Sequence, residues 1–531
     1  MKSSLLIRGG TVVDGSGSAA YRADVLVEED TISAVSPDLA VGSDTRVIQA
    51  AGKIVCPGFI DLHSHADFTL LAFPGADSAL RQGITTVAVG NCGGGVAPAS
   101  DRWDVREVAF AFSSEWGVPL DWSTFGEYTR RLDGAAINVA PLVAHGAIRS
   151  AAMGLAQRAA SPAEVEVMED LLRSSLAEGA FGMSTGLQYL PGSWASRDEI
   201  RSLVSIVGET GRTYATHMRN RADQFADATI EAITTAEHTG AHLQLSHFAP
   251  RPYAPPEQVD AAFAAVAEAV AGGQAIGIDT FPEIWGPALL VDLFPAEVMK
   301  GSLEEVLDRL GEESVLTSID KHFESKVSFL ARIAGYGEIY LSGMPKPDDR
   351  IGLSLGELAD RTRRSVGRLS SALLREAAEL YRTVGIRHIY ATESDLRRTL
   401  ELPYCSVESD GIVTTGEGSE CSLSWNASTY GYTARVLEHY VRGEGFLTLE
   451  DAIRKMTALP AQALKLRSRG TLQPGNYADV VVLDLDTIED RTTPDDMARY
   501  PAGIELVLVN GKVAYQGPGD TGFRHGRLLA P

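Results

Sequence analysis

Short apolar segments alternate with amphipathic helical patterns through the middle of the chain. Eight of these segments predict strands, each followed by a helix or a loop: Gly58–His65, Thr85–Cys92, Ile137–His145, Ala180–Thr185, Arg212–His217, Ala241–His247, Ala275–Thr280 and Tyr404–Ser409. This alternation is typical of parallel βα units, and a (β/α)8 barrel contains eight of them. We therefore predict an α/β fold in which residues 58–465 form a TIM-like barrel. A doubly wound open sheet is the alternative architecture.

The two ends of the chain have a different pattern, with short strand-like runs separated by turn residues. Residues 1–57 contain apolar runs broken by Gly9–Gly10 and Asp14–Gly15, and residues 466–531 contain a hairpin pattern around Asn510–Gly511. We predict that residues 1–57 and 466–531 together form one small composite β-sandwich. Two unrelated appendages are the alternative.

The segment between the seventh and eighth predicted strands is much longer than an ordinary connection. Residues 283–400 carry amphipathic helical patterns, and we predict that they form a helical insertion. Because connections after barrel strands lie at the C-terminal mouth, we expect this insertion over the mouth, as a lid. A subunit contact is the alternative role for it.

Composition and charge exclude several functions. The 531 residues include 47 Lys and Arg against 70 Asp and Glu, a net charge of −23. Such a surface repels nucleic acids and anionic membranes.

Four cysteines without a CxxC pair argue against a disulfide scaffold or a zinc ribbon. No apolar run reaches the ~18 residues of a membrane span, and no secretory segment is recognisable, so we expect a soluble, cytoplasmic protein that acts on a small molecule. The sequence leaves homo-oligomerisation open.

Six residues with metal-binding side chains end or directly follow predicted strands: His63, His65, Cys92, His217, His247 and Asp410. In a parallel barrel all strand C-termini meet at one mouth, so these side chains should converge. Imidazole, thiolate and carboxylate are ligands of zinc, and we predict a zinc site there. A buried structural role is the alternative for each residue taken singly. His145, which ends the third strand, either lines the same pocket or is structural.

The chain resembles the amidohydrolase superfamily and, within it, the N-acyl-D-amino-acid deacylase (D-aminoacylase) family. The segments that carry the resemblance are Pro57–His65, Thr85–Gly93, Gly182–Tyr189, Thr216–Arg219, Leu245–His247, Ser409–Gly411 and Gly470–Leu483. The resemblance covers nearly the whole chain. It implies a β-sandwich beside the barrel, zinc at the barrel mouth and hydrolysis of a linear N-acyl bond in a small-molecule substrate.

The resemblance also implies two groups of metal ligands. A tight zinc would use Cys92, His217 and His247, and a weaker second site would use His63, His65, Cys92 and Asp410. Many amidohydrolases bridge two metals with a fourth-strand lysine, but no lysine lies between Lys53 and Lys300. This argues against the alternative of a cyclic-amide hydrolase of the hydantoinase or dihydroorotase kind. A non-catalytic scaffold on the same fold, the other alternative, would be expected to have lost ligands.

The predicted mechanism uses Asp410 as both base and acid. Zinc lowers the pKa of a bound water towards ~7, and Asp410 can accept its proton and later deliver it to the leaving nitrogen. A turn residue within Ser-Asp-Gly is the alternative role of Asp410. By resemblance, Tyr189 and Arg219 contact the substrate, although Arg219 is equally compatible with a structural ion pair.

The expected cations for a substrate carboxylate are absent. Family members usually carry a lysine after the sixth-strand histidine, where this chain has Phe248–Pro250, and an arginine soon after the eighth-strand aspartate. Residues 411–434 contain no Arg, Lys or His. A desolvated carboxylate needs a charged partner. Either the leaving amine lacks a carboxylate at the usual place, or another arginine binds it, with Arg219, Arg251 and Arg397 as the candidates.

Overall fold

The structure is a computed structural model that describes residues 4–103, 116–295, 297–325, 335–344, 348–417, 425–493, 496–517 and 523–531. Of the four cysteines, Cys421 lies outside these ranges. None of the helices within them has the length and apolar character that a membrane span requires.

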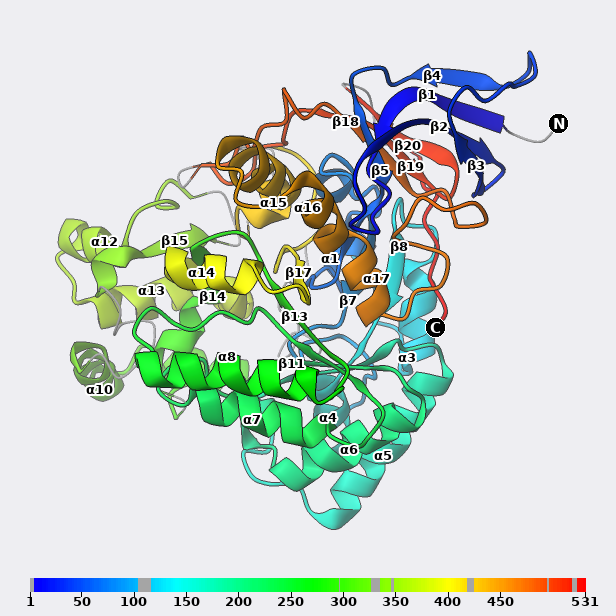
Figure 1. The fold of residues 1–531 in the computed structure, drawn as a ribbon. Helices are drawn as coiled ribbons and strands as arrows, with labels where there is room; N and C mark the ends of the chain where they lie inside the picture. The colour runs from blue at the N-terminus through cyan, green and yellow to red at the C-terminus, as the bar shows by residue number, and fades with distance from the viewer. Residues whose placement is uncertain are drawn as a thin grey trace.

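A closed parallel barrel forms the centre of the molecule (Figure 1). Its first three strands pair as β6 (Phe59–Asp61), β7 (Ile84–Val89) and β8 (Asn138–Pro141). The remaining strands follow in the order β9 (Val143–Ala144), β10 (Gly182–Gly186), β11 (Thr213–His217), β12 (His242–Leu245), β13 (Ile276–Thr280) and β17 (Cys405–Val407). Only Leu142 separates β8 from β9, and a parallel bridge between Ser64 and Gly411 joins the first strand to the last. The predicted barrel is confirmed, and an open sheet is excluded.

Helices cover the outside of the barrel, so its strands are buried on both faces, as in β7, where every residue is buried. Two of the longer helices have capped N-termini: Ser161 and Glu164 form a capping box in front of α5, and Ser196 caps α6. The helices of the barrel are α1 (Thr69–Ala72), α2 (Asp77–Leu80), α3 (Phe125–Thr129), α4 (His145–Met153), α5 (Pro162–Ala177), α6 (Arg197–Glu209), α7 (Phe225–Ala236), α8 (Pro256–Ala271), α15 (Ser428–Arg435), α16 (Leu449–Met456) and α17 (Ala458–Ala463).

Both ends of the chain enter one eight-stranded sheet, seen in blue and red in Figure 1. Its strands are β1 (Ser4–Val12), β2 (Tyr21–Glu28), β3 (Thr31–Ser36), β4 (Arg46–Gln49), β5 (Ile54–Pro57), β18 (Val480–Leu483), β19 (Ile504–Val509) and β20 (Lys512–Gln516). Strand β18 pairs with β5, so the two ends are not unrelated appendages. The finer description of this sheet as a β-sandwich, and the domain limits, stay predictions.

Residues 283–400 contain strands as well as helices, which the sequence patterns did not predict. Strands β14 (Trp285–Leu289), β15 (Ile339–Gly343) and β16 (Gly385–Ile389) form an antiparallel sheet. The helices in this segment are α9 (Leu303–Arg309), α10 (Glu313–Glu324), α12 (Leu355–Thr362), α13 (Val366–Ala377) and α14 (Glu393–Leu400). The segment has a hydrophobic core of its own, which includes Ile319, Leu341 and Leu373. Its role as a lid stays a prediction.

A buried polar network joins the terminal sheet to the barrel. The Asp479 carboxylate accepts hydrogen bonds from the Asn138 side chain (3.1 Å) and the Asn510 backbone N–H (2.8 Å), and it pairs with Arg469. The Asn510 side chain in turn donates to the Asn138 side-chain oxygen at 2.8 Å. Since these side chains are almost fully buried, their hydrogen bonds cannot be replaced by solvent.

Replacing Asp479 with Ala should destabilise the protein strongly, because it leaves the buried Arg469 guanidinium without its carboxylate. We expect a loss of about 3–5 kcal/mol in unfolding free energy, measured by chemical denaturation. Asp484→Ala is the matched control, because Asp484 pairs with the more exposed Lys53 and its loss should cost about 0–1 kcal/mol. Equal losses in the two variants would contradict this assignment.

Candidate metal centre

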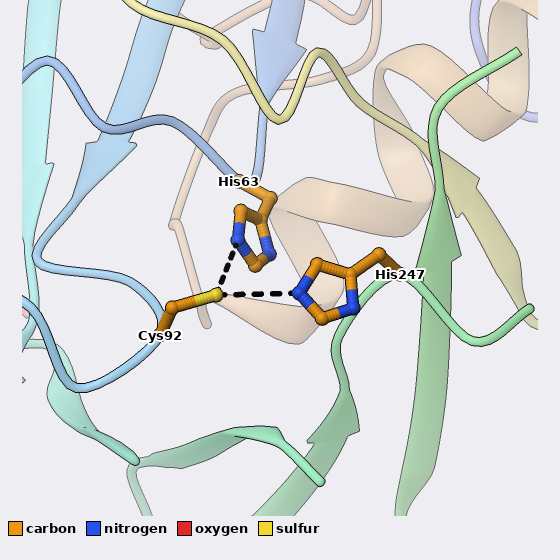
Figure 2. A group of neighbouring side chains, drawn as sticks. All are labelled: His63, Cys92 and His247. Carbon is orange, nitrogen blue, oxygen red and sulfur yellow. Dashed lines mark hydrogen bonds between the residues drawn. The ribbon is translucent and has the colours of Figure 1, made fainter. Parts of the chain in front are cut away.

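Three imidazoles surround the thiol sulfur of Cys92 at the mouth of the barrel. The Cys92 Sγ atom lies 3.2 Å from His63 Nε2, 3.3 Å from His247 Nε2 and 3.6 Å from His217 Nδ1. Figure 2 shows His63 and His247 reaching the sulfur from separate strand ends. The facing nitrogens of His217 and His247 are 2.8 Å apart. The four donors thus form one compact group.

A second group shares His63 with the first. The Asp410 Oδ1 atom lies 3.1 Å from His65 Nε2 and 3.7 Å from His63 Nε2. The ligand atoms of His63, His65 and Asp410 all lie within 4.8 Å of one another, as do those of His63, Cys92 and His247. The structure therefore brings together all six residues that the sequence singled out, and all are buried.

The backbone turns sharply at three of these residues. Cys92, His247 and Asp410 have φ values of 52°, 36° and 43°, in the left-handed region that residues other than glycine rarely adopt. Such conformations cost of order 1–3 kcal/mol each and cluster at functional sites. The loop after β7 also needs a glycine opposite it at the end of β10, since a Cβ atom on Gly186 would lie 1.9 Å from the Cys92 carbonyl oxygen. The fold thus holds the Cys92 loop tightly against β10.

Carboxylates beneath the mouth orient these residues. Asp279 on β13 accepts the backbone N–H of His247 at 2.6 Å and lies 3.5 Å from His63 Nδ1. Asp61 on β6 accepts the hydroxyl of Ser409 at 2.6 Å, directly before Asp410 in the chain. The second ring nitrogen of His217 contacts Gln188 Oε1 at 2.9 Å. Partners of this kind fix the ring orientation of metal-binding histidines.

The electrostatics suit a cation between these groups. Burial lowers the pKa values of His217 and His247 well below the ordinary range, and the charge of Arg221 lowers both further. Burial raises the pKa of Cys92, but the His63 imidazole opposes it and the result is a lowered pKa. The low pKa values keep His217 and His247 neutral, and the lowered pKa of Cys92 favours its thiolate; these are the protonation states in which such side chains bind metals.

The second group carries opposite charges. Burial lowers the pKa of His65, but Asp410 and Cys92 together outweigh it through hydrogen bonding and charge, and they raise the value to about 9. Burial raises the pKa of Asp410, but the hydrogen bond to His65 and the charges of His63, His65 and Arg221 together lower it, so the carboxylate stays ionised. A cation that binds His65 has to displace the proton of this pair.

The other sequence candidates lie differently. The Tyr189 ring packs against the His217 ring, with centroids 4.3 Å apart, so Tyr189 borders the cluster. His145 Nε2 lies 2.9 Å from Glu199 Oε1, which also binds the buried Arg149. This buried network agrees with a structural role for His145, the alternative to lining the pocket. The Arg219 guanidinium donates to Glu231 at 3.1 Å and to the carbonyl of Ser193 at 3.2 Å, which is the ion-pair alternative.

Sequence reasoning missed Arg221 and Tyr390. Arg221 donates to the His247 carbonyl at 3.0 Å, and its guanidinium carbon lies 4.7 Å from the centre of the Tyr390 ring. The Arg251 guanidinium lies 4.9 Å from the same ring. A charged residue in the loop after β11, four positions past His217, was the available signal for Arg221.

The architecture is that of a TIM-barrel-like metal hydrolase. It is a parallel barrel with imidazole, thiol and carboxylate groups at the C-terminal ends of its strands. The model of the Amidohydrolase family matches residues 46–283 and 420–515, more than half of the chain. The chain belongs to the amidohydrolase family and is therefore a hydrolase of carbon–nitrogen bonds.

Three similar proteins span the full length. An N-acyl-D-glutamate deacylase of Alcaligenes xylosoxydans xylosoxydans is 33% identical over 99% of this chain and 96% of its own. The crystal structure of an N-acyl-D-glutamate deacylase from Bordetella bronchiseptica with zinc and a phosphonate inhibitor superposes with a TM-score of 0.81 at 30% identity, covering 100% of both chains. A D-aminoacylase with a binuclear metal centre has a TM-score of 0.82 at 30% identity, covering 99% of each chain. The predicted resemblance is confirmed.

We expect Arg219→Gln to act on stability rather than on substrate affinity. Its loss leaves the buried Glu231 carboxylate short of partners, which should cost about 1–3 kcal/mol in chemical denaturation. The KM for an amide substrate should stay within about threefold of the wild-type value, because the guanidinium of Arg219 donates to Glu231 and to the carbonyls of Ser193 and Ala195, none of which belongs to the Cys92 cluster. A tenfold rise in KM without loss of stability would contradict this.

Proposed function

We propose that this protein is a zinc-dependent hydrolase of a linear N-acyl bond, similar to the N-acyl-D-amino-acid deacylases. The observation that carries the proposal is the Cys92 thiol between His63, His217 and His247. The full-length relatives are deacylases, which act on linear amides, and one of them was crystallised with zinc. Strand β10, the fourth of the barrel, contains no lysine, which argues against the bridging group of cyclic-amide hydrolases.

The donor groups fit zinc in chemistry and spacing. One thiolate and two neutral imidazoles form the three-ligand set of catalytic zinc sites, which keep a further position open. We assign Cys92, His217 and His247 to a tight zinc. His63, His65 and Asp410, with Cys92 shared, would hold a second and weaker one. The stoichiometry is part of the proposal.

In the proposed reaction, bound zinc supplies an activated water and polarises the scissile carbonyl. Asp410 accepts the proton of the attacking water, since its carboxylate is ionised and lies beside both metal groups. The protonated Asp410 then donates to the amide nitrogen, because an amine leaves only when protonated. The left-handed turn at Asp410 and the hydrogen bond from His65 hold the carboxylate in place for both steps.

Tyr189 is the remaining proposed contact to the substrate. Its ring lies against His217, and burial raises the pKa of its hydroxyl well above the ordinary range, so the hydroxyl stays protonated. A protonated phenol at this position can donate a hydrogen bond to the acyl oxygen as negative charge develops there. Arg219 and His145 have no such role in the proposal, because both are engaged in ion-pair networks.

Cys92→Ala should remove the tight zinc. We expect elemental analysis to give at least one zinc per wild-type chain and less than a tenth of that in the variant, with deacylation lost in parallel. Cys405→Ala is the matched control, because Cys405 is equally buried but belongs to neither candidate metal group. Full zinc content in Cys92→Ala would refute the ligand assignment. A wild-type protein without zinc would favour the scaffold alternative.

Asp410→Asn should separate catalysis from tight metal binding. The amide cannot act as a base, so kcat for an N-acetyl-D-amino acid should fall by about 10²–10⁴-fold. The zinc bound by the Cys92 group should remain, as measured on the same samples. A variant that keeps its zinc and more than a third of its activity would show that another group moves the proton.

A further inference from the structure

Two arginine side chains are buried together beside the candidate metal centre. Arg221 and Arg251 are 3% and 5% exposed, and both guanidinium groups lie within 5 Å of the Tyr390 ring centre. The backbone N–H of Arg251 donates to the Arg221 carbonyl at 2.8 Å, which ties the loops after β11 and β12 to each other. The pair is therefore built into the mouth rather than lying on the surface.

The charge of Arg221 has no anionic partner within the described part of the chain. Its Nη1 atom donates to the His247 carbonyl and to the Tyr390 hydroxyl, both uncharged, and its Nε atom has no hydrogen-bond partner. A buried guanidinium without an anion is unfavourable, and a second guanidinium nearby makes it more so. The nearby carboxylate of Asp410 is engaged by His65. An anion from outside the chain would complete this arrangement.

The position relative to the metal ligands suggests which anion that is. Arg221 and Tyr390 both bind the backbone carbonyl of His247, whose ring faces Cys92. In an N-acyl amino acid, the carboxylate carbon lies only two bonds from the scissile amide nitrogen. A carboxylate held by Arg221 would thus lie beside a bond placed at the Cys92 cluster. Guanidinium groups suit this task because they bind carboxylates in a bidentate fashion.

We propose that Arg221, supported by Arg251 and Tyr390, binds the free α-carboxylate of an N-acyl amino acid. This inference rests on the proposed deacylase function and names the chemical class of its amine half. It resolves the alternatives that the sequence left open, in favour of a substrate with a carboxylate. The arginine is one that the sequence did not single out. Arg219 is held by Glu231, and Arg397 by Glu393 and Glu444.

The test compares free acids with amides. N-Acetyl-D-leucine and N-acetyl-D-glutamate are assayed with wild type, Arg221→Gln and Arg221→Lys, each substrate with a free and with an amidated α-carboxylate. We expect wild type to favour the free acids by at least 100-fold in kcat/KM. Arg221→Gln should lose most of this preference, mainly through a higher KM for the acids, so that kcat/KM falls at least tenfold more for the acids than for the amides. Arg221→Lys should keep part of it, because the charge remains without the bidentate geometry.

The control is Arg398→Gln, which removes an equal charge from an exposed pair with Asp260 and should retain the wild-type preference. Zinc content and thermal midpoint check that the Arg221 variants are folded, and Arg221→Lys carries the test if Arg221→Gln is not. An unchanged preference in the folded variants would overturn the inference. Equal turnover of acids and amides by wild type would also overturn it, while leaving the deacylase function intact. No turnover of any substrate by zinc-loaded wild type would contradict the proposed function itself, and the inference with it.

Discussion

The Cys92 sulfur lies within 3.6 Å of three imidazole nitrogens whose residues stand at or just past the ends of three different strands. No local sequence pattern can hold such a contact, so it depends on the closure of the barrel through Ser64 and Gly411. The glycine at position 186 lets the Cys92 loop approach β10, and left-handed turns at Cys92, His247 and Asp410 shape the chain just past the strand ends. The strain of these turns is borne by a well-packed scaffold, as is usual at active sites.

The charges at the mouth are divided between two sides. On one side, His65 and Asp410 stabilise each other's ionised forms. On the other, burial lowers the pKa values of His217 and His247, and the charges of Arg221 and Arg251 lower them further. The two arginines therefore favour the neutral imidazoles, the form that binds metal, but burial has the larger effect.

The barrel and its six candidate ligands were predictable because apolar runs and strand-end positions are local properties of the sequence. The strands β14, β15 and β16 were not, since Trp285–Leu289 contains Gly286 and Pro287 and lacks the alternation that predicts a strand. Tyr390 could not be predicted because it follows β16 in the insertion and reaches the mouth only through the tertiary fold. Arg221 could not be told from an ordinary loop arginine by sequence, because its burial beside His247 depends on the tertiary fold.

The most direct test of the central claim is zinc K-edge X-ray absorption on the purified wild-type protein. If Cys92, His217 and His247 bind zinc, the first shell should contain one sulfur at about 2.3 Å and nitrogen or oxygen ligands at about 2.0–2.2 Å. The same sample should show outer-shell scattering from imidazole rings. A first shell made only of nitrogen and oxygen, with no sulfur, would contradict the proposed role of Cys92 as a zinc ligand.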